Sequence, residues 1–367
     1  MKALKAIGLM SGTSMDGIDV ALLETDGETI SAFGPTGSRA YAPAERAVIA
    51  AAVAQAPAIT DRNDRSGVFG EAERVVTEAH TEAVERFLAD NGLAADDVDI
   101  VGFHGQTIYH RPEKRLTVQI GDGPALAARL GIDVVHDLRA ADVAAGGQGA
   151  PFVPVYHQAL AAHAGLELQV VVVNLGGVGN VTYLSDAPPL AFDTGPANAL
   201  IDDWVSEHAG IPFDEGGRIA AAGHVRESVL TELLESPYFL KKPPKSLDRN
   251  DFSMAGLAGL SLEDGAATLA AFTAVSLALA GDWFPEPARQ WIVVGGGARN
   301  PTLMAMLRDR LGAPVLTGAE IGWSGDHVEA QAFAYLAVRS LRGLPLTFPT
   351  TTGAPEPLTG GVLVKAR

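Results

Sequence analysis

A glycine-rich hairpin that occurs twice, about half the chain apart, constrains the fold of this sequence more than any other feature. In the first copy, AIGLMSGTSMDGIDVALLETDG, apolar strands at residues 6–10 and 18–24 flank a turn at residues 11–17. The second copy, LQVVVVNLGGVGNVTYLSD, repeats this plan around residues 174–180. Because each hairpin opens an α/β segment, the repeat predicts a duplicated fold of two lobes with an anion held between them.

The first turn carries groups that a phosphate can use. Gly12 and Gly17 let the backbone approach an anion closely. Ser11, Thr13 and Ser14 supply hydroxyl donors. An ordinary polar hairpin turn explains this one stretch equally well, since tight turns select glycine, serine and aspartate. The return of the same design in the second hairpin favours a nucleotide site.

The length and the charge balance set the class of protein. At 367 residues the chain exceeds what one hydrophobic core usually organises, so we expect two domains. Its 27 basic and 44 acidic residues give a net charge of −17, which disfavours binding to nucleic acid or to an anionic membrane surface. The absence of cysteine excludes disulfides, thiolate nucleophiles and cysteine-ligated zinc.

The sequence pattern predicts neither a signal peptide nor a membrane span. The apolar run that follows Met1 breaks at Ser11, which is too early for a signal peptide. No stretch approaches the roughly 20 apolar residues of a transmembrane helix. We therefore expect a soluble, cytoplasmic protein.

Polar residues just beyond predicted strands are candidate ligand groups. His104 follows one strand, and Asp122 follows the next at the head of a helix. A hydrogen-bonded structural histidine is an equally good interpretation of His104. Arg139 is the best basic candidate to grip a carboxylate or a phosphate. Pairing with Asp137 or Asp142 in a structural network is the alternative, with equal weight.

Asp193 is the candidate for acid–base chemistry. It stands at the end of an apolar strand, immediately before a predicted helix that opens near Pro196. A carboxylate in this position can act as a general base on a water or a hydroxyl group, or it can cap the helix. The two glycine-rich hairpins favour the base.

Two later stretches complete the candidates. A strand ends in three glycines at residues 295–297, and a helix starts near Asn300. Such a turn lets a nucleotide base or sugar lie against bare backbone. The basic loop of residues 236–252 carries Lys245 and Arg249, which could meet an acidic substrate, although a solvated loop is the commoner outcome.

Several signatures are absent from the sequence. It has no GxxxxGK[ST] phosphate loop and no HExxH pair, and its GxGxxN stretch lacks the third glycine of the dinucleotide fingerprint. These absences disfavour a P-loop protein, a zinc hydrolase and an NAD-dependent enzyme.

Nine stretches in order give the chain a close resemblance to the anhydro-N-acetylmuramic acid kinases of peptidoglycan recycling. They are GLMSGTSMDGID, HGQT, TVQIGD, DLRAADVAAGGQGAP, NLGGVGN, FDTGPAN, PPKS, VVGGGARN and HVEAQAFA. The resemblance implies an α/β fold of the actin, hexokinase and chaperone-ATPase type, in which each lobe is a mixed sheet and ligands bind between the lobes. It places residues 1–135 and 326–367 in the first lobe and residues 136–325 in the second.

The resemblance also implies a reaction and its cofactors. Members of the family use ATP and Mg²⁺ to open the 1,6-anhydro ring of anhydro-N-acetylmuramic acid with water and to phosphorylate O6, which gives N-acetylmuramic acid 6-phosphate and ADP. By motif position, Asp193 looks like the base that activates the water. Asp16 would hold the metal through water. The resemblance suggests a homodimer.

The motifs carry the remaining site residues. The nucleotide-binding residues implied are Gly12, Thr13, Ser14, Met15, Asp16, Gly17, Ile18, Asp19, Asn174, Gly176, Gly177, Asn180, Gly295, Gly296, Gly297 and Asn300. The substrate-binding residues implied are His104, Asp122, Arg139, Asn198 and Glu329, the last in the first turn of a predicted helix at residues 326–341.

The sequence departs from the family pattern in two places. Residues 247–250 replace the Thr-Gly-Arg-Glu that often follows PPKS, which leaves a contact from Arg249 in doubt, and Thr194 stands where a cysteine is common. Two other functions compete with the kinase. They are a different sugar or carboxylate kinase of the same fold, and a non-catalytic sensor of cell-wall fragments. The intact Asp193 and first turn argue against the sensor.

Overall fold

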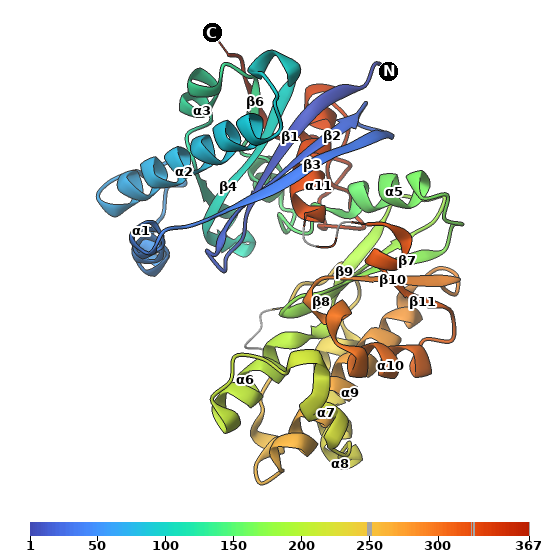
Figure 1. Cartoon of the computed structure of the whole chain (residues 1–367). Helices are drawn as coiled ribbons and strands as arrows, with labels where there is room; N and C mark the ends of the chain where they lie inside the picture. Colours follow the sequence, from blue (N-terminus) through green and yellow to red (C-terminus); the bar gives the residue numbers. More distant parts are fainter. Residues whose placement is uncertain (248–251, 324, 326, 367) are drawn as a thin grey trace. The chain divides into compact units, whose positions relative to one another are not determined.

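Two compact units make up the protein. The structure, a computed structural model, describes residues 1–247, 252–323, 325 and 327–366. Unit 1 consists of Met1–His163 and Asp326–Arg367, and unit 2 is Ala164–Gly325 (Figure 1). Each unit is built on one mixed sheet with flanking helices, so the predicted α/β class with two mixed sheets is confirmed.

The sheet of unit 1 contains the first hairpin. Its strand order is β12-β6-β4-β1-β2-β3, and β5 pairs with β4. β1 runs antiparallel to β2 and parallel to β4. The strands are β1 (Leu4–Ser11), β2 (Gly17–Thr25), β3 (Ile30–Ala40), β4 (Ile100–Arg111), β5 (Leu116–Ile120), β6 (Val134–His136) and β12 (Val362–Val364). The buried centre of β1 explains why its apolar run was readable from the sequence.

Helices cover the sheet of unit 1 and bury its apolar side chains. In Figure 1, α11 lies against β1 and β4, and Gly8 and Gly102 face each other across these strands where the helix backbone approaches. The helices are α1 (Pro43–Gln55), α2 (Val68–Asp90), α3 (Gly123–Leu130), α4 (Ala140–Ala145), α5 (Pro154–His163) and α11 (Val328–Leu341). Periodicity identified the long helices but missed the short α4.

The C-terminal segment of unit 1 is a structural part of its core. Thr347 and Thr352 donate to Asp142 at 2.6 and 2.7 Å, and all three residues are buried. Tyr156 donates to Gln331 at 2.9 Å. These contacts keep residues 136–163 in unit 1, whereas the sequence analysis assigned them to the second lobe. The glycine-rich stretch around Asp142 is therefore not a crossing between the units.

The sheet of unit 2 contains the second hairpin. Its strand order is β11-β10-β7-β8-β9, with β7 parallel to β10 and antiparallel to β8. The strands are β7 (Val170–Leu175), β8 (Val178–Leu184), β9 (Leu190–Pro196), β10 (Gln290–Val294) and β11 (Val315–Thr317). The helices are α6 (Asn198–Ala209), α7 (Arg218–Ala222), α8 (Glu227–Leu234), α9 (Leu262–Ala280) and α10 (Pro301–Arg310).

Helix α9 corrects one expectation about membranes. The segment Leu262–Trp283 is long and apolar enough to cross a bilayer by length and composition, although the sequence analysis found no such stretch. The most apolar window of this segment is 72% buried within the protein. Its apolar side chains pack against β9, α6, α7, α8 and α10, as expected of a central core helix.

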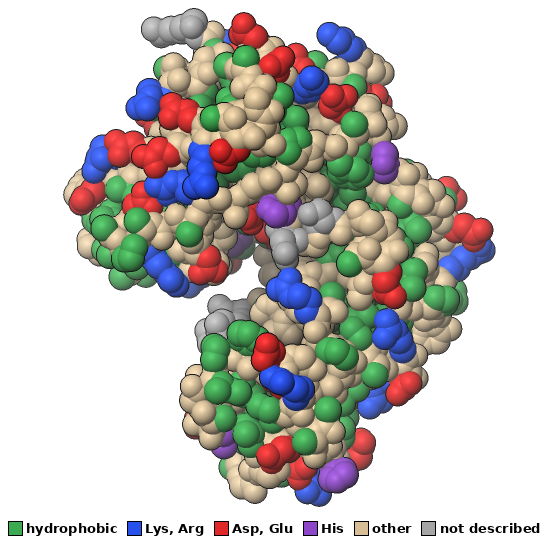
Figure 2. Space-filling model, in the orientation of Figure 1, with side chains coloured by type: hydrophobic (Ala, Val, Ile, Leu, Met, Phe, Trp, Pro, Cys, Tyr) green, Lys and Arg blue, Asp and Glu red, His purple; other side chains and the backbone are tan. Residues whose placement is uncertain are grey.

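The surface over α2 carries charged side chains of both signs. Figure 2 shows them in blue and red at the place where Figure 1 labels this helix. On this helix Arg74 pairs with Glu78 at 2.9 Å and Arg86 pairs with Asp90 at 3.4 Å, each pair one turn apart. Such exposed pairs contribute only about 0.3–0.5 kcal/mol each. They keep the outer face of α2 polar, and the stability of unit 1 comes from its buried side.

Candidate active site

Buried polar side chains form hydrogen bonds with the first two residues of the first glycine-rich turn. Ser11 hydrogen-bonds to Tyr41 at 3.0 Å and donates to Gln106. The amide of Gln106 donates to the carbonyl oxygen of Gly12 at 2.9 Å. Neither Gln106 nor Tyr41 is among the site residues predicted from the sequence, because they lie 95 and 30 residues from Ser11 along the chain and reach it only through the fold.

The turn itself closes tightly. The backbone N–H of Met15 donates to the carbonyl oxygen of Gly12 at 3.1 Å, and Met15 has a left-handed φ of 57°. Its side chain packs on the apolar core of unit 1. Thr13 is exposed at the tip. Of the nucleotide-binding candidates in this turn, Met15 therefore serves as an anchor for the loop.

A pocket of about 350 Å³ opens beside the turn within unit 1. It brings together the first hairpin and the first turn of α11, which are far apart in the sequence. The lining residues are Met10, Gly12, Ser14, Asp16, Gly17, Ile18, Asp19, Ser38, Arg39, Ala40 and Glu329. Six of the predicted nucleotide-binding residues and one predicted substrate-binding residue thus share one pocket.

The carboxylates of this pocket differ in environment. Part of the Glu329 side chain reaches solvent, yet the surrounding protein desolvates its carboxyl group, and this raises the pKa of Glu329. The charge of Arg139 lowers that pKa, and the charge of Asp19 raises it further. The Asp16 side chain is 77% exposed and lies 3.8 Å from Arg46. Arg46 also donates to the carbonyl oxygen of Ser14 at 3.3 Å. Arg46 is a cation at the turn that the sequence analysis missed.

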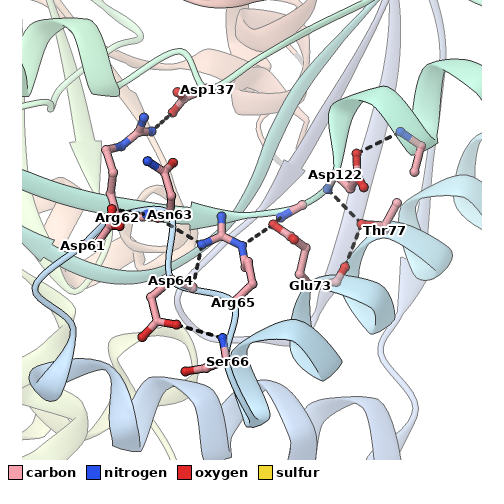
Figure 3. Close-up of polar contacts among 12 residues, drawn as sticks. Asp61, Arg62, Asn63, Asp64, Arg65, Ser66, Glu73, Thr77, Asp122 and Asp137 are labelled. Carbon is pink, nitrogen blue, oxygen red and sulfur yellow. Dashed lines mark hydrogen bonds and ion pairs between the residues drawn. The ribbon is translucent and has the colours of Figure 1, made fainter.

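A second pocket of unit 1, of about 290 Å³, contains His104 and Asp122. Figure 3 shows the loop of residues 61–66 on its border. There Arg65 donates to Glu73 at 2.6 Å, and Arg62 pairs with Asp137 (Figure 3).

Asp122 has a structural task at this second pocket. Its side chain accepts from the N–H of Ala125 at 2.9 Å and caps α3, and its own N–H donates to Thr77 at 2.9 Å (Figure 3). The capped end of α3 also lines the pocket through Gly123. The carboxylate is thus fixed in place at the edge of the pocket.

Arg139 and His104 form one buried unit. The guanidinium donates to His104 Nε2 at 3.1 Å and to the carbonyl oxygen of Gly149 at 2.7 Å. His104 Nδ1 lies 2.8 Å from the carbonyl oxygen of Gly105, so this nitrogen carries the proton of a neutral ring. Burial and the charge of Arg139 hold the pKa of His104 well below its usual range.

Asp137 and Asp142, the two carboxylates considered as structural partners of Arg139, bond to other groups. Asp137 pairs with Arg62, and Asp142 accepts from the N–H of Gly149 and from two threonines. The Arg139 guanidinium lies instead over the rings of Phe152 and Phe333, at 5.1 and 5.8 Å from their centroids. Burial lowers its pKa to about 10, while Glu329 and Asp142 act in the opposite direction.

In unit 2, three predicted site residues form a row across neighbouring strands. Asn174 on β7 is the register partner of Asn180 on β8, and Asn180 is the partner of Asp193 on β9. Directly paired residues of adjacent strands point to the same face of a sheet. The second hairpin and Asp193 thus present their side chains together.

Asp193 is not a helix cap. Helix α6 begins at Asn198, its N-cap is Ala197, and Pro196 is the last residue of β9, so the N-cap interpretation and the predicted helix start were wrong. One carboxylate oxygen of Asp193 accepts from the N–H of Leu247 at 2.8 Å. Burial raises the pKa of Asp193 to about 6, against the opposing effect of this hydrogen bond.

The segment that precedes Leu247 holds the backbone of Asp193. The N–H of Asp193 donates to the carbonyl oxygen of Lys245 at 3.0 Å, and the hydroxyl of Tyr238 donates to the carbonyl oxygen of Asp193 at 2.6 Å. Tyr238 is buried. The expected solvated loop is therefore wrong for Lys245, whose segment packs against β9. Arg249 lies outside the described residues.

The glycines after β10 press against the second hairpin. Gly295 has a φ of 82°, and a Cβ built there would lie 2.4 Å from Asn174 Oδ1 and 2.9 Å from the carbonyl oxygen of Leu175. A Cβ at Gly297 would lie 2.6 Å from Leu175 Cβ. Asn198 donates to that same carbonyl oxygen of Leu175 at 2.9 Å. Only glycine fits this close approach.

The backbone of the second turn is largely used by α6. Gly176 and Gly177 accept through their carbonyl oxygens from the N–H groups of Ala197, Asn198 and Ala199, at 3.0 to 3.1 Å. The second turn and the start of α6 form one rigid corner.

A pocket of about 430 Å³ in unit 2 adjoins the three glycines. Gly296, Asn198 and Asn300 line it, and Asn300 also caps α10 by accepting from the N–H of Leu303 at 3.0 Å. The other lining residues are Ile201, Asp202, Phe213, Asp214, Glu215, Gly216 and Arg299. None of these other residues was predicted as a site residue from the sequence, although Arg299 belongs to the VVGGGARN stretch.

Comparison with known proteins identifies relatives of the whole chain. The model of a family described as "Anhydro-N-acetylmuramic acid kinase" matches residues 4–366. A protein of that name from Methylobacterium nodulans is 57% identical, over 99% of this chain and 100% of the relative. Another of the same name, from Bradyrhizobium diazoefficiens, is 55% identical over 99% of each chain.

The solved structures that resemble this chain in fold are more distant in sequence than these relatives. Component A of (R)-2-hydroxyglutaryl-CoA dehydratase from Acidaminococcus fermentans has a TM-score of 0.46 and 13% identity, and the match covers 92% of this chain and 99% of that one. A xylulose kinase from Lactobacillus acidophilus has a TM-score of 0.43 and 11% identity, over 99% of this chain and 94% of the other. These two likenesses are too distant to bear on function.

Proposed function

The chain belongs to the anhydro-N-acetylmuramic acid kinase family, and from that premise we propose that it couples hydrolytic opening of the 1,6-anhydro ring to phosphorylation of O6. In this reaction the oxygen of a water forms a bond to C1 and the bond between C1 and O6 breaks. O6 then takes the γ-phosphoryl group of ATP. The products are N-acetylmuramic acid 6-phosphate and ADP.

Asp193 carries the proposal as the general base that takes the proton of the attacking water. A base works best when its pKa lies near the working pH, and burial raises the pKa of Asp193 to about 6. The carboxylate is fixed by the Leu247 amide and stands in a row with Asn180 and Asn174. Its geometry is that of an oriented base.

The phosphate groups of ATP are assigned to the two glycine-rich turns. In unit 1 the assigned residues are Gly12, Thr13, Ser14, Asp16, Gly17, Ile18 and Asp19, with Met15 as their anchor. Phosphoryl transfer needs mainly alignment and neutralisation of charge. Arg46, at the carbonyl of Ser14, adds a positive charge there. In unit 2 the assigned residues are Asn174, Gly176, Gly177 and Asn180.

Mg²⁺ fits the exposed carboxylate of Asp16. The described residues contain no group of three histidine or acidic side chains able to hold a metal by themselves. Mg²⁺ characteristically keeps several waters and binds phosphates with one or two carboxylates, which suits Asp16 at 77% exposure. When bound, the ion would neutralise charge on the phosphates.

The adenosine is assigned to the pocket beside the three glycines of unit 2. Of the three glycines, Gly296 lines this pocket together with Asn300, while Gly295 and Gly297 pack against the second hairpin. A volume of about 430 Å³ lies in the range of small-molecule sites. We keep Asn198 as the sugar contact of unit 2; its side chain lines the same pocket and donates to the carbonyl oxygen of Leu175.

Sugar contacts are assigned to four residues of unit 1. Glu329 lies in the pocket of the first turn, while His104 and Asp122 line the neighbouring pocket. Arg139 is bonded to His104 and is close enough to Glu329 to affect its pKa. A neutral histidine, two carboxylates and a guanidinium match the hydroxyl, amide and carboxyl groups of an acidic amino sugar.

The cellular role follows from the same assignment. We place the enzyme in the cytoplasm, in the recycling of cell-wall peptidoglycan, where ATP is available. A homodimer is the proposed assembly.

Labelled water tests the proposal. The reaction run in ¹⁸O-water with ATP and anhydro-N-acetylmuramic acid should place the label at C1, as mass analysis of the product would show. Label-free product would contradict hydrolytic ring opening.

A substitution tests the base. Asp193→Asn should abolish turnover in a coupled ADP-release assay while ATP still binds by calorimetry, because the amide keeps the volume but accepts no proton. Asp186→Asn, an exposed position between β8 and β9, is the matched control and should retain turnover. Near-normal turnover of Asp193→Asn would exclude Asp193 as the base.

A further inference from the structure

Residues 236–247, here called the strap, grip Asp193 at three points. Lys245 accepts through its carbonyl oxygen from the Asp193 N–H, Tyr238 donates to the Asp193 carbonyl oxygen, and Leu247 donates to the carboxylate. The strap thus sets both the backbone position of Asp193 and the orientation of its carboxylate.

The side chain of Lys245 ties the two ends of the strap together. Its ammonium donates to the carbonyl oxygens of Tyr238 and Phe239, at 3.2 and 3.5 Å. Lys245 thereby connects the two parts of the strap that contact Asp193. Tyr238 contacts the carbonyl oxygen of Asp193, and residues 245–247 contact its N–H and its carboxylate.

Aromatic rings surround the ammonium. It lies 4.6 Å from the centroid of the Tyr238 ring, 5.6 Å from that of Trp283 and 5.8 Å from that of Phe192. The faces of such rings attract a cation and partly replace its lost hydration. The space left beside Lys245, Phe192 and Trp283 is about 10 Å³, no more than one water needs. A substrate therefore has no room here.

The cation and the carboxylate lie on opposite sides of β9. Phe192 faces Lys245, and Asp193 is the next residue of the strand, so its side chain points the other way. The effect of Lys245 on Asp193 is thus mechanical, through the strap, and not a direct ion pair.

From these contacts we propose that Lys245 is a positioning residue, which holds the Asp193 carboxylate in its working orientation by locking the strap. This inference rests on the proposed function of Asp193. It concerns a residue that does not itself touch the reacting atoms.

Lys245→Met tests the proposal. Methionine fills the aromatic surroundings but cannot donate to the two carbonyl oxygens. We expect kcat to fall about 10- to 100-fold, the usual consequence of a misplaced reacting group, while KM for ATP and for the sugar changes less than about twofold. Lys241→Met is the matched control, because Lys241 lies 5.6 Å over the same Tyr238 ring from an exposed position, and its kcat should stay within about twofold of the parent.

The pH profile separates positioning from a general structural defect. Loss of the Leu247 hydrogen bond removes the contact that lowers the pKa of Asp193, so the acid limb of kcat should move to higher pH in Lys245→Met. Lys241 is the charged neighbour of Lys245, and its cation helps lower the pKa of Lys245 to about 8, after burial. The Lys241→Met control therefore also checks for a purely electrostatic effect.

Tyr238→Phe keeps the proposal testable if Lys245→Met does not fold. This variant retains the ring but removes the donor to the Asp193 carbonyl, and it should show the same loss of kcat with unchanged KM. Parent-like kcat and acid limb in the folded variants would overturn the positioning role, even if Asp193→Asn is inactive. Full turnover of Asp193→Asn would instead overturn the proposed function.

Discussion

At the scale of single residues, Asp193 combines two properties that oppose each other. Burial in unit 2 raises the pKa of its carboxyl group to about 6, so the ionised form costs folding free energy at neutral pH. The same rise brings the carboxylate near the pKa that a general base needs. The residue is held in this unfavourable setting by the Leu247 amide and the strap.

Because the ionised Asp193 carboxylate costs folding free energy, we predict that Asp193→Asn stabilises the protein at pH 7. The folded pKa of about 6 exceeds the ordinary value of 3.8, so folding disfavours the ionised side chain above both values. A neutral amide avoids this cost, by up to about 3 kcal/mol. Urea unfolding should therefore show higher stability for the variant at pH 7. The difference should shrink as the pH falls below about 6 and vanish well below 3.8, where the Asp193 carboxyl group is neutral in both the folded and the unfolded state. Equal stability at pH 7 would contradict the raised pKa.

At the scale of elements, α11 approaches the centre of the unit 1 sheet unusually closely. A Cβ at Gly8 would lie 1.8 Å from the carbonyl oxygen of Ala330, and one at Gly102 would lie 2.1 Å from that of Phe333. The two glycines are register partners on β1 and β4. This contact sets Glu329, in the first turn of α11, in the pocket of the phosphate-binding turn.

Gly8→Ala should therefore separate α11 from β1. Overpacking of a core costs typically 1–3 kcal/mol, and a backbone clash of this depth belongs at about 3 kcal/mol or above. Chemical unfolding should show the loss, together with a higher KM for the sugar, because Glu329 moves with the helix. Gly281→Ala is the control, since nothing lies within 4 Å of a Cβ there and the backbone is helical. Unchanged stability of Gly8→Ala would show that the helix can shift freely.

Elements with a regular pattern were predictable from the sequence, and those fixed by distant partners were not. The hairpin strands and the start of α3 at its Asp122 cap followed from periodicity and from the capping residue. By contrast, Asp142 takes its partners from the C-terminal segment, more than 200 residues away. Lys245 likewise looked like a surface cation, because two of its aromatic neighbours are distant in sequence: Phe192 lies on β9 and Trp283 lies just after the end of α9.

At the scale of the whole molecule, unit 1 contains three buried histidines. Burial lowers the pKa of His80 to about 4 and that of His157 to about 3, and it holds the pKa of His104 well below its usual range. All three are neutral in the folded protein near pH 5, whereas they would be charged in an unfolded chain. Acid therefore favours the unfolded state of unit 1.

The free energy of unfolding should fall between pH 7 and pH 5. A lowered histidine pKa leaves stability intact above the unfolded value of about 6.5 and removes it as the pH falls toward the folded value. Each of the three histidines should contribute about 2 kcal/mol of the loss at pH 5. Urea titrations at the two pH values would measure it. His80→Gln should reduce the loss by about 2 kcal/mol, the share of one histidine, with a comparison at pH 8 to correct for packing. The same pH dependence in this variant would contradict the assignment.

The two-part composition of unit 1 has a consequence for biosynthesis. Strand β12 pairs in the sheet of unit 1 and helix α11 packs on that sheet, yet the ribosome makes both after all of unit 2. Unit 2 is contiguous in sequence, so it can complete its core while still tethered to the ribosome. The groove on β1 and β4 that Gly8 and Gly102 create stays open to water until α11 emerges. Nascent chains therefore carry an uncovered apolar sheet face for most of their synthesis, and this face is where chaperones would be needed.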